Sequence, residues 1–296
     1  MTDGNEHSID LATTLGWVAN TRDAVRATGD DVVDFLQGQL SQDVKTLAAG
    51  QSAWSLLLQP QGKISSYLRV TRLGDAEYIL DVDAGHAEPM LTRLNRFKLR
   101  TKCDLEPLDW TSISVRGPGA ASVGHEGAVV AALVHWGAIE GIDLLGPTPS
   151  VTGDIAVATE AAFDLARIRG GIPALGAELT EDTIPAAAGI VDDAVSFTKG
   201  CYTGQELVAR IDSRGGNVPQ RLVDLVVAEG VPPVGAALIA GEKTVGRVTS
   251  VGPVGAGSHA LAYLARSVAT PATVEIHDEG ASWSGQASAL LPSATS

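Results

Sequence analysis

The stretch KGCYTGQELVARI, residues 199–211, separates two parts of the chain that differ in their sequence pattern. Before it, helical and strand patterns are mixed; after it, short strand-like runs are punctuated by Gly and Pro. Within it, Thr203 and Glu206 have the spacing of a capping box, and Tyr202 and Leu207 stand at the positions of a hydrophobic staple. The stretch therefore predicts a helix that starts at Thr203.

One of the two cysteines of the chain, Cys201, lies just before this predicted helix, near the positive end of its dipole. In an extended segment Lys199 would point to the same side as Cys201, because side chains alternate along a strand. Both effects favour thiolate over thiol, and Gly200 allows backbone conformations that a Cβ forbids. These residues predict an activated, accessible thiol. The alternative is a small buried residue that packs against a helix start.

Residues 1–215 carry helix and strand patterns without a regular order. Residues 30–44 and 88–99 place apolar side chains at helical spacing. Two strand patterns flank the turn PQG at residues 60–62, which predicts a hairpin. No regular alternation of strand, helix and strand is present, so the fold class expected for this region is α+β.

Residues 216–296 contain six short strand-like runs, each bounded by Gly or Pro. This spacing is typical of a small β-barrel or sandwich. The chain is therefore expected to consist of a large α+β region, residues 1–215, and a separate C-terminal β part, residues 216–296.

The composition excludes several classes of protein. Lys and Arg number 21 against 35 Asp and Glu, a net charge of −14, which repels phosphate backbones and anionic lipid. General nucleic-acid binding is therefore not expected, although a local basic patch could survive in an acidic protein. The chain has no apolar run of about 18 residues that would span a membrane, and its first residues do not read as a signal peptide.

Metal and disulfide chemistry are also not expected. The two cysteines form no CxxC pair, and the six histidines are scattered without an i,i+4 pair. No metal site is predicted. These features together favour a cytoplasmic protein in a reducing compartment.

The motif KGCYTGQE (199–206) resembles the signature of the YgfZ family, folate-binding proteins implicated in iron–sulfur cluster assembly and repair. That family is similar in fold to the T-protein, the aminomethyltransferase of the glycine cleavage system. The resemblance extends over almost the whole chain through stretches that fall in the family's order: FLQGQLSQDV (35–44), LLLQPQGKI (56–64), LNRFKLRTK (94–102), RIRGGIPALGAEL (167–179), TIPAA (183–187) and VGRVTS (245–250).

The resemblance implies three parts arranged around a central opening that holds the folate, the third part being a β-barrel. It implies tetrahydrofolate or a derivative as cofactor and iron–sulfur enzymes or cluster-assembly proteins as partners. It also implies a reactive Cys201 whose pKa Lys199 would lower. Any effect on tRNA modification would pass through an iron–sulfur enzyme, without direct binding of nucleic acid or membrane.

One departure separates the chain from the T-protein. T-proteins place an Asp in the strand after the hairpin, where it would contact the reacting nitrogen of tetrahydrofolate. The matching stretch GKISSYLRV offers Ser65, Ser66 and Tyr67 instead. A neutral hydroxyl cannot take the proton or stabilise the positive charge of aminomethyl transfer. Loss of the carboxylate that does so commonly lowers the rate by a factor on the order of 10² to 10⁴. Glycine cleavage is therefore not expected as the main activity.

A second departure concerns folate recognition. Many relatives have Glu where this chain has Arg169, so recognition of the pterin amino group must differ here or use another carboxylate, such as Glu206 or Asp83. Phe163 matches an aromatic residue that flanks folate in some members. The expected folate-binding residues are Phe163, Arg169, Tyr202, Gln205, Glu206 and Arg210, the last for an anionic group such as the glutamate tail.

Two other functions stay open at this point. The first is a tetrahydrofolate-dependent aminomethyl or C1 transferase that replaces the missing Asp by another group. The second is a folate-sensing scaffold whose cysteine motif binds a protein partner. The expected function is a folate-binding accessory protein for the assembly or repair of iron–sulfur enzymes, and whether the chain turns over a substrate stays open.

Overall fold

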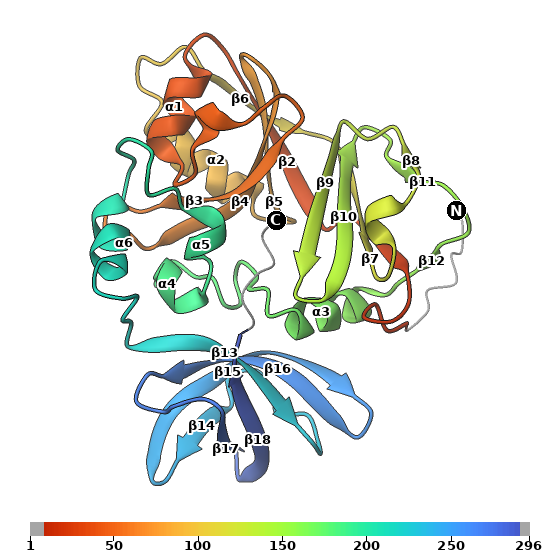
Figure 1. Cartoon of the computed structure of the whole chain (residues 1–296), viewed down its shortest axis with the longest axis vertical. Helices are drawn as coiled ribbons and strands as arrows, with labels where there is room; N and C mark the ends of the chain where they lie inside the picture. Colours follow the sequence, from red (N-terminus) through yellow and green to blue (C-terminus); the bar gives the residue numbers. More distant parts are fainter. Residues whose placement is uncertain (1–8, 291–296) are drawn as a thin grey trace.

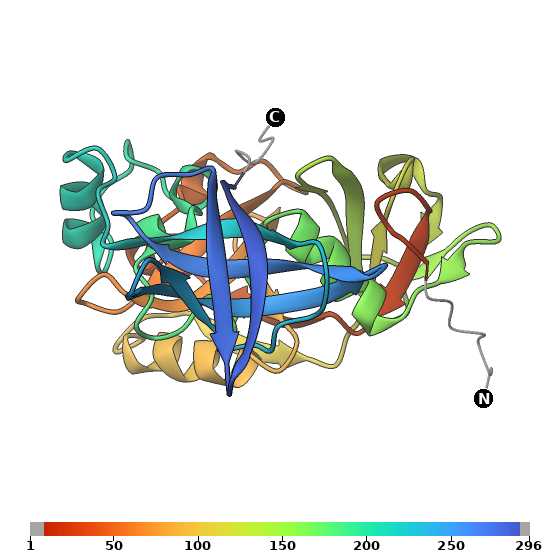
Figure 2. The same ribbon diagram turned by 90° about the horizontal axis from the view of Figure 1, so that it is seen from below.

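The structure, a computed structural model, describes residues 9–290. Figure 1 shows three parts: two sheets that lie beside each other and a barrel beneath them. Seen from below, the barrel lies across the other two parts (Figure 2). None of the helices in residues 9–290 combines the length and apolar character needed to cross a membrane.

The first part is a five-stranded sheet of order β3-β4-β5-β2-β6 covered by two helices. Its elements are β2 (Arg22–Thr28), α1 (Val32–Gln39), η1 (Val44–Thr46), β3 (Ser52–Leu58), β4 (Ile64–Gly74), β5 (Glu77–Asp83), α2 (Ala87–Arg96) and β6 (Asp104–Leu108). The predicted hairpin forms: β3 pairs antiparallel with β4, and Gly62 in the turn has φ 77°. The apolar spacing that predicted both helices identified part of their buried face, since Val32, Leu36, Met90 and Leu94 are buried. The same pattern places Phe97 inward, which is wrong: α2 ends at Arg96, and Phe97 is 39% exposed.

Helix α1 is shorter than the pattern over residues 30–44 suggests. It ends at Gln39, and Leu40 forms an isolated β-bridge with Leu57. The apolar spacing continues through Leu40 because its side chain is buried too, although its backbone is extended. Hydrophobic spacing alone cannot distinguish these two conformations.

The second part is a five-stranded sheet of order β12-β1-β7-β10-β9. Its strands are β1 (Gly16–Ala19), β7 (Thr111–Arg116), β9 (Val130–Trp136), β10 (Ile139–Gly146) and β12 (Ala156–Val157), and η2 (Ala120–Ser122) and the pair β8 (His125–Glu126) and β11 (Ser150–Val151) flank it. The chain thus begins in the second sheet with β1 and crosses into the first with β2. The second sheet is therefore formed by residues from both sides of the first sheet in the sequence, whereas the first sheet is formed by one continuous stretch.

A helical segment leads from the second sheet to a closed barrel. The helices are α3 (Glu160–Arg169), α4 (Pro185–Ala188), α5 (Val191–Ala194) and α6 (Gln205–Asp212). The barrel has the strand order β13-β16-β15-β14-β17-β18. Its strands are β13 (Gln220–Val227), β14 (Ala237–Ala240), β15 (Lys243–Val254), β16 (Gly257–Ala265), β17 (Ala272–Asp278) and β18 (Ala281–Ala289). The α+β class and the C-terminal barrel are confirmed.

A buried network of charged side chains joins the two sheets. Arg69 of β4 donates from Nε to Asp81 Oδ2 on β5 and from Nη1 to Asp143 Oδ2 on β10, both at 3.0 Å. Arg116 of β7 pairs with the other oxygen of Asp143 at 2.8 Å, and Arg22 of β2 pairs with Asp81. Burial alone would raise the pKa of Asp143, but Arg116, Arg69 and Arg22 outweigh it and hold that pKa well below its usual range.

We predict that Asp143→Asn destabilises the protein by about 3–5 kcal/mol, because it leaves buried guanidinium groups without their carboxylate. Urea unfolding at pH 7 measures this. The stabilisation by Asp143 is complete above the ordinary Asp pKa of about 4 and is lost as the pH falls below it, so the variant should also lose part of the acid sensitivity.

The control is Asp75→Asn, which removes a fully exposed carboxylate paired with Arg72 and should change the free energy of unfolding by less than about 0.5 kcal/mol. Equal effects of the two substitutions would contradict the assigned role of the network.

Candidate functional site

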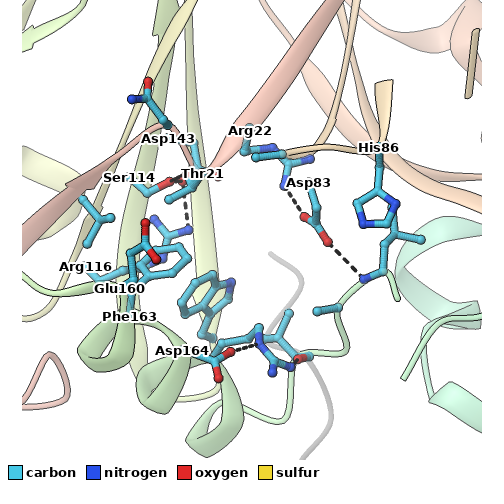
Figure 3. A pocket seen from close by; sticks show the side chains of 18 of the residues that line it. Thr21, Arg22, Asp83, His86, Ser114, Arg116, Asp143, Glu160, Phe163 and Asp164 are labelled. Atoms are coloured by element: carbon cyan, nitrogen blue, oxygen red, sulfur yellow. Dashed lines mark hydrogen bonds and ion pairs between the residues drawn. The ribbon is translucent and has the colours of Figure 1, made fainter. Parts of the chain in front are cut away.

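A cavity of about 310 Å³ lies where the two sheets meet α3 (Figure 3). Two tryptophans, a tyrosine, a phenylalanine and a set of ionisable side chains line it: Trp54, Tyr67, Trp136, Phe163, Arg22, Asp83, His86, Arg116, Asp143, Glu160, Asp164 and Arg167. In Figure 3, Asp83 and His86 lie on one side, and Arg116, Glu160 and Phe163 on the other. Arg22, Arg116 and Asp143 belong to the buried ionic network, so the cavity is built directly on the junction of the sheets.

The aromatic residues form two pairs from different parts of the chain. Trp54 of β3 stacks on Tyr67 of β4 with centroids 4.7 Å apart. Trp136 at the end of β9 meets Phe163 of α3 edge to face at 4.8 Å. Flat apolar surfaces of this kind are suited to a ligand that contains a ring.

Arg116 lies against the second aromatic pair. Its guanidinium carbon is 3.9 Å from the Trp136 ring centroid, and the side chain is almost completely buried. Nη1 donates to the Val115 carbonyl and Nη2 pairs with Asp143, whereas Nε is buried and has no partner among residues 9–290. Burial lowers the pKa of Arg116, against the opposing effect of Asp143. A buried donor without a partner next to a cavity is a feature that a ligand oxygen can satisfy.

Three carboxylates at the cavity can accept hydrogen bonds from a ligand. Asp83 accepts from Arg22 Nη1 at 3.0 Å and from the backbone N–H of Leu175 at 3.2 Å, yet its side chain stays about one-third exposed. Asp164 accepts from Arg167 Nε at 2.7 Å. Glu160 lies in the first turn of α3 and is exposed.

Of the eight residues that the sequence predicts for the site, Phe163 lines this cavity. Arg169 ends the same helix but lies outside the cavity, where it donates from Nη1 to both carboxylate oxygens of Asp10 at 2.8 Å. The other six lie on α6 and on the loop before it, and none of them lines the cavity: Lys199, Cys201, Tyr202, Gln205, Glu206 and Arg210.

The loop that carries Cys201 differs from its predicted geometry, and the predicted capping box is wrong. Helix α6 begins at Gln205 with Gly204 as N-cap at φ 84°, so Thr203 is not the cap. The Thr203 N–H donates to the Gly38 carbonyl instead, and Gln205 Oε1 accepts from the N–H of Tyr202. Any Cβ at residue 204 would lie 2.5 Å from the Gln59 carbonyl, so close packing against the β3–β4 turn requires glycine there.

Cys201 is exposed, and no hydrogen bond to its sulfur occurs in the described part of the chain. The Lys199 ammonium is half-buried and donates to three backbone carbonyls at the end of α1: Gln37 at 2.7 Å, Leu40 at 2.5 Å and Gln42 at 3.0 Å. Burial lowers the pKa of Lys199 to about 8. Its three protons are therefore directed at α1, and its expected effect on the thiol stays a prediction.

The loop and the cavity are linked by one apolar cluster. Tyr202, next to Cys201, is buried in the same cluster as Tyr67, and Trp54 and Leu175 pack against that cluster. Tyr67, Trp54 and Leu175 also line the cavity. The exposed thiol and the cavity therefore lie at two ends of a continuous packed region.

The strand that carries a catalytic Asp in T-proteins has no carboxylate at those positions here. The Ser66 hydroxyl is buried and has no partner among residues 9–290, and Ser65 lies outside the cavity. Tyr67 does line the cavity, but burial raises its pKa far above the usual value, so its hydroxyl stays protonated.

Sequence reasoning missed Trp54, Trp136, Arg116 and Glu160. The scarcity of aromatic residues, 4% of the chain, is a signal that could have drawn attention to the two tryptophans. Arg116 had no such signal, because it looks like an ordinary arginine at the end of a strand.

Comparison with known proteins gives three kinds of match. The family model described as GCVT N-terminal domain matches residues 19–132. A protein of Hamiltonella defensa named tRNA-modifying protein YgfZ is 30% identical over 241 residues, which cover 72% of this chain and 70% of that protein. A protein of Mycosarcoma maydis named as a mitochondrial homolog of the iron–sulfur cluster assembly factor IBA57 is 27% identical over 245 residues, 72% of this chain and 57% of the relative.

Among solved structures, the glycine cleavage system aminomethyltransferase T from Bartonella henselae superposes with a TM-score of 0.81 over 95% of this chain and 87% of that chain. At 20% identity this similarity shows the fold alone. The sequence similarity to a YgfZ protein extends over more than two thirds of both chains, and the T-protein fold agrees with it. The chain therefore belongs to the YgfZ family, which is related to the T-protein of glycine cleavage.

Proposed function

We propose that this chain is a folate-binding accessory protein that supports the assembly or repair of iron–sulfur enzymes in the cytoplasm. The observation that carries the proposal is the cavity at the junction of the two sheets, with aromatic pairs and carboxylates around it, in a member of the YgfZ family. The ligand proposed for this cavity is tetrahydrofolate or a derivative.

The residues around the cavity fit the chemistry of a reduced pterin. The pyrimidine ring of a reduced pterin is planar, which suits the aromatic pairs. The amino group and the N–H of that ring donate hydrogen bonds, for which Asp83 or Glu160 is a suitable acceptor. The unpartnered Nε of Arg116 matches a carbonyl oxygen on the same ring. The cavity volume is at the lower end of the range for ligand pockets, so the glutamate tail would extend outside.

The iron–sulfur part of the proposal is supported by the relatives. One of them is named an iron–sulfur cluster assembly factor homolog and another a tRNA-modifying protein. Both names are compatible with one role if the present chain maintains an iron–sulfur enzyme that modifies tRNA. The proposed partners are thus iron–sulfur enzymes or cluster-assembly proteins.

Cys201 is the residue proposed to act on the partner. It is exposed at the surface, and a thiolate is a good ligand for iron in clusters. We propose that it contacts a cluster or its carrier transiently during transfer or repair, so the cluster is cargo and not a resident group. A tetrahydrofolate-dependent aminomethyl or C1 transferase is the weaker alternative, because β4 offers Ser65, Ser66 and Tyr67 where T-proteins have a carboxylate.

Lys199 is proposed to hold the cysteine loop in place. The three carbonyls at the end of α1 carry the negative end of the helix dipole and accept from its ammonium group. At pH 7 the amine is mostly protonated despite its pKa of about 8, so all three donors are present. Two backbone hydrogen bonds also fix the loop: the N–H of Ser196 donates to the Ser41 carbonyl, and the N–H of Thr203 donates to the Gly38 carbonyl.

We predict that the cavity binds a reduced folate. Calorimetric titration with 5-formyltetrahydrofolate should give about one site per chain, and Phe163→Ala should weaken binding by about 10-fold because the ligand loses an aromatic wall. The control is Arg169→Ala on the same helix, outside the cavity, which should leave the Kd unchanged. No saturable binding at millimolar ligand would contradict the folate proposal.

We predict that the Cys201 thiol is needed for the action on iron–sulfur enzymes. Cys201→Ala should abolish rescue of iron–sulfur enzyme activity in a strain that lacks this protein, with folate affinity and unfolding free energy unchanged because the side chain is exposed. Cys103→Ala is the control: it removes a buried thiol and should lower stability but retain rescue. Full rescue by Cys201→Ala would refute the assignment.

We predict that Lys199 stabilises the cysteine loop. Lys199→Met should lower the free energy of unfolding by about 1–3 kcal/mol, since three carbonyls lose their donor. It should also speed hydrogen exchange at the amides of Ser196 and Thr203. Lys45→Met, which removes a nearby exposed amine paired with Asp34, should change neither. If Lys199→Met leaves hydrogen exchange unchanged and alters only the pH profile of Cys201 alkylation, the amine acts on the thiol and does not hold the loop.

A further inference from the structure

A short basic segment stands out in this acidic chain. Residues 93–102, RLNRFKLRTK, contain five cationic side chains and no carboxylate, although the net charge of the whole chain is −14. The segment comprises the last turn of α2 and the loop that leads to β6. The local field at this surface is therefore opposite in sign to the average over the protein.

Most of these cations point into solvent and have no counter-ion. Arg96 and Arg100 are exposed and Lys98 is half-buried, and none of the three forms an ion pair with any residue in 9–290. Lys102 is paired weakly with Asp30, at 3.5 Å. The backbone at Arg100 has φ 60°, a left-handed conformation uncommon for a residue with a side chain.

Two large apolar side chains lie among the cations. Leu99 is 84% exposed and Phe97 39% exposed. The Arg93 guanidinium lies 3.9 Å from the Phe97 ring centroid, which fixes one face of the ring against the protein. Exposed aromatic and arginine side chains next to each other are enriched in the energetically important parts of protein interfaces.

The segment borders a surface depression of about 680 Å³. Arg93, Arg96 and Phe97 form part of its lining, and Gln59 and Gln61 of the β3–β4 turn form another part. The same turn packs against Gly204 in the cysteine loop, as the short distance from residue 204 to the Gln59 carbonyl shows. The depression and the cysteine loop are thus neighbours across one turn.

A second contact connects the basic segment to the cysteine loop. Arg93 Nη1 donates to Gln39 Oε1 at 3.3 Å, in the last turn of α1. Lys199 donates to the carbonyls of Gln37 and Leu40 in the same turn. The basic segment and the cysteine loop therefore both contact the C-terminal end of α1. A partner bound to the basic segment would lie close to the loop with the exposed Cys201.

We propose that residues 96–102, here called the basic surface, form the docking site for the protein partner on which Cys201 acts, and that this partner presents carboxylates around an apolar patch. The proposal rests on the proposed function of Cys201. Arg96, Lys98 and Arg100 orient the partner through charge, and Phe97 and Leu99 supply the apolar contact that stabilises the complex.

A protein fits this surface better than a nucleic acid does. The rest of the chain is acidic and opposes the approach of a long polyanion, whereas a protein needs to match only the local surface. Leu99, which is almost fully exposed, also favours an apolar pocket on a partner over a phosphate backbone.

The test compares two charge reversals of equal size in the full-length protein. One is Arg96→Glu/Lys98→Glu/Arg100→Glu on the basic surface; the control is Lys243→Glu/Arg247→Glu/Arg266→Glu on the barrel. Both should retain the 5-formyltetrahydrofolate Kd and the thermal midpoint of the wild type. Iron–sulfur enzyme activity in the deletion strain should fall at least 10-fold with the first variant and stay at the wild-type level with the control.

A milder double variant, Phe97→Ser/Leu99→Ser, keeps the test decisive if the charge reversal does not fold, and it should also lose activity. Wild-type rescue by either basic-surface variant in folded form would overturn the docking site. If Cys201→Ala also rescues, the proposed function fails; if Cys201→Ala does not, only the docking site fails. Binding of a labelled 20-nucleotide RNA that disappears in the charge-reversal variant would identify a nucleic acid as the occupant and overturn the protein partner.

Discussion

The rest of the structure depends on the ionic network in which Arg69 of the first sheet reaches Asp143 of the second. A charge buried without its partner is costly, so the network allows few arrangements of the two sheets. Arg116 and Arg22 extend it to the surface of the cavity. The same constraint that fixes the relative position of the sheets therefore also fixes the polar groups available to a ligand.

This arrangement explains how a member of the YgfZ family can retain a ligand cavity without the carboxylate of the T-proteins. The cavity walls come from strands of both sheets and from α3, and the tyrosine of β4 contributes an aromatic face. The absence of an acidic residue from β4 leaves these aromatic surfaces intact. The aromatic surfaces of the cavity and the carboxylate of the T-proteins are thus different residues of this fold, and the first are present here without the second.

The cysteine loop illustrates how a short motif depends on distant parts of the chain. Locally, KGCYTGQE reads as a thiol beside an ammonium group and a capping box. In the folded chain the ammonium of Lys199 is occupied by carbonyls of α1, about 160 residues earlier, and Gly204 is fitted against the β3–β4 turn. Local propensity was overridden here because two other segments, the end of α1 and the β3–β4 turn, compete for the same donors and the same space.

The sequence by itself determined the α+β class, the β3–β4 hairpin, the buried faces of α1 and α2 and the run of barrel strands, because periodic burial and turn residues are local properties. The tertiary structure alone decided which residues meet in the cavity. Arg116, Trp136 and Glu160 lie far from Trp54 in the chain, and contacts between the two sheets, such as that of Arg69 with Asp143, bring them together. Long-range contacts of that kind leave no periodic signal in a single sequence.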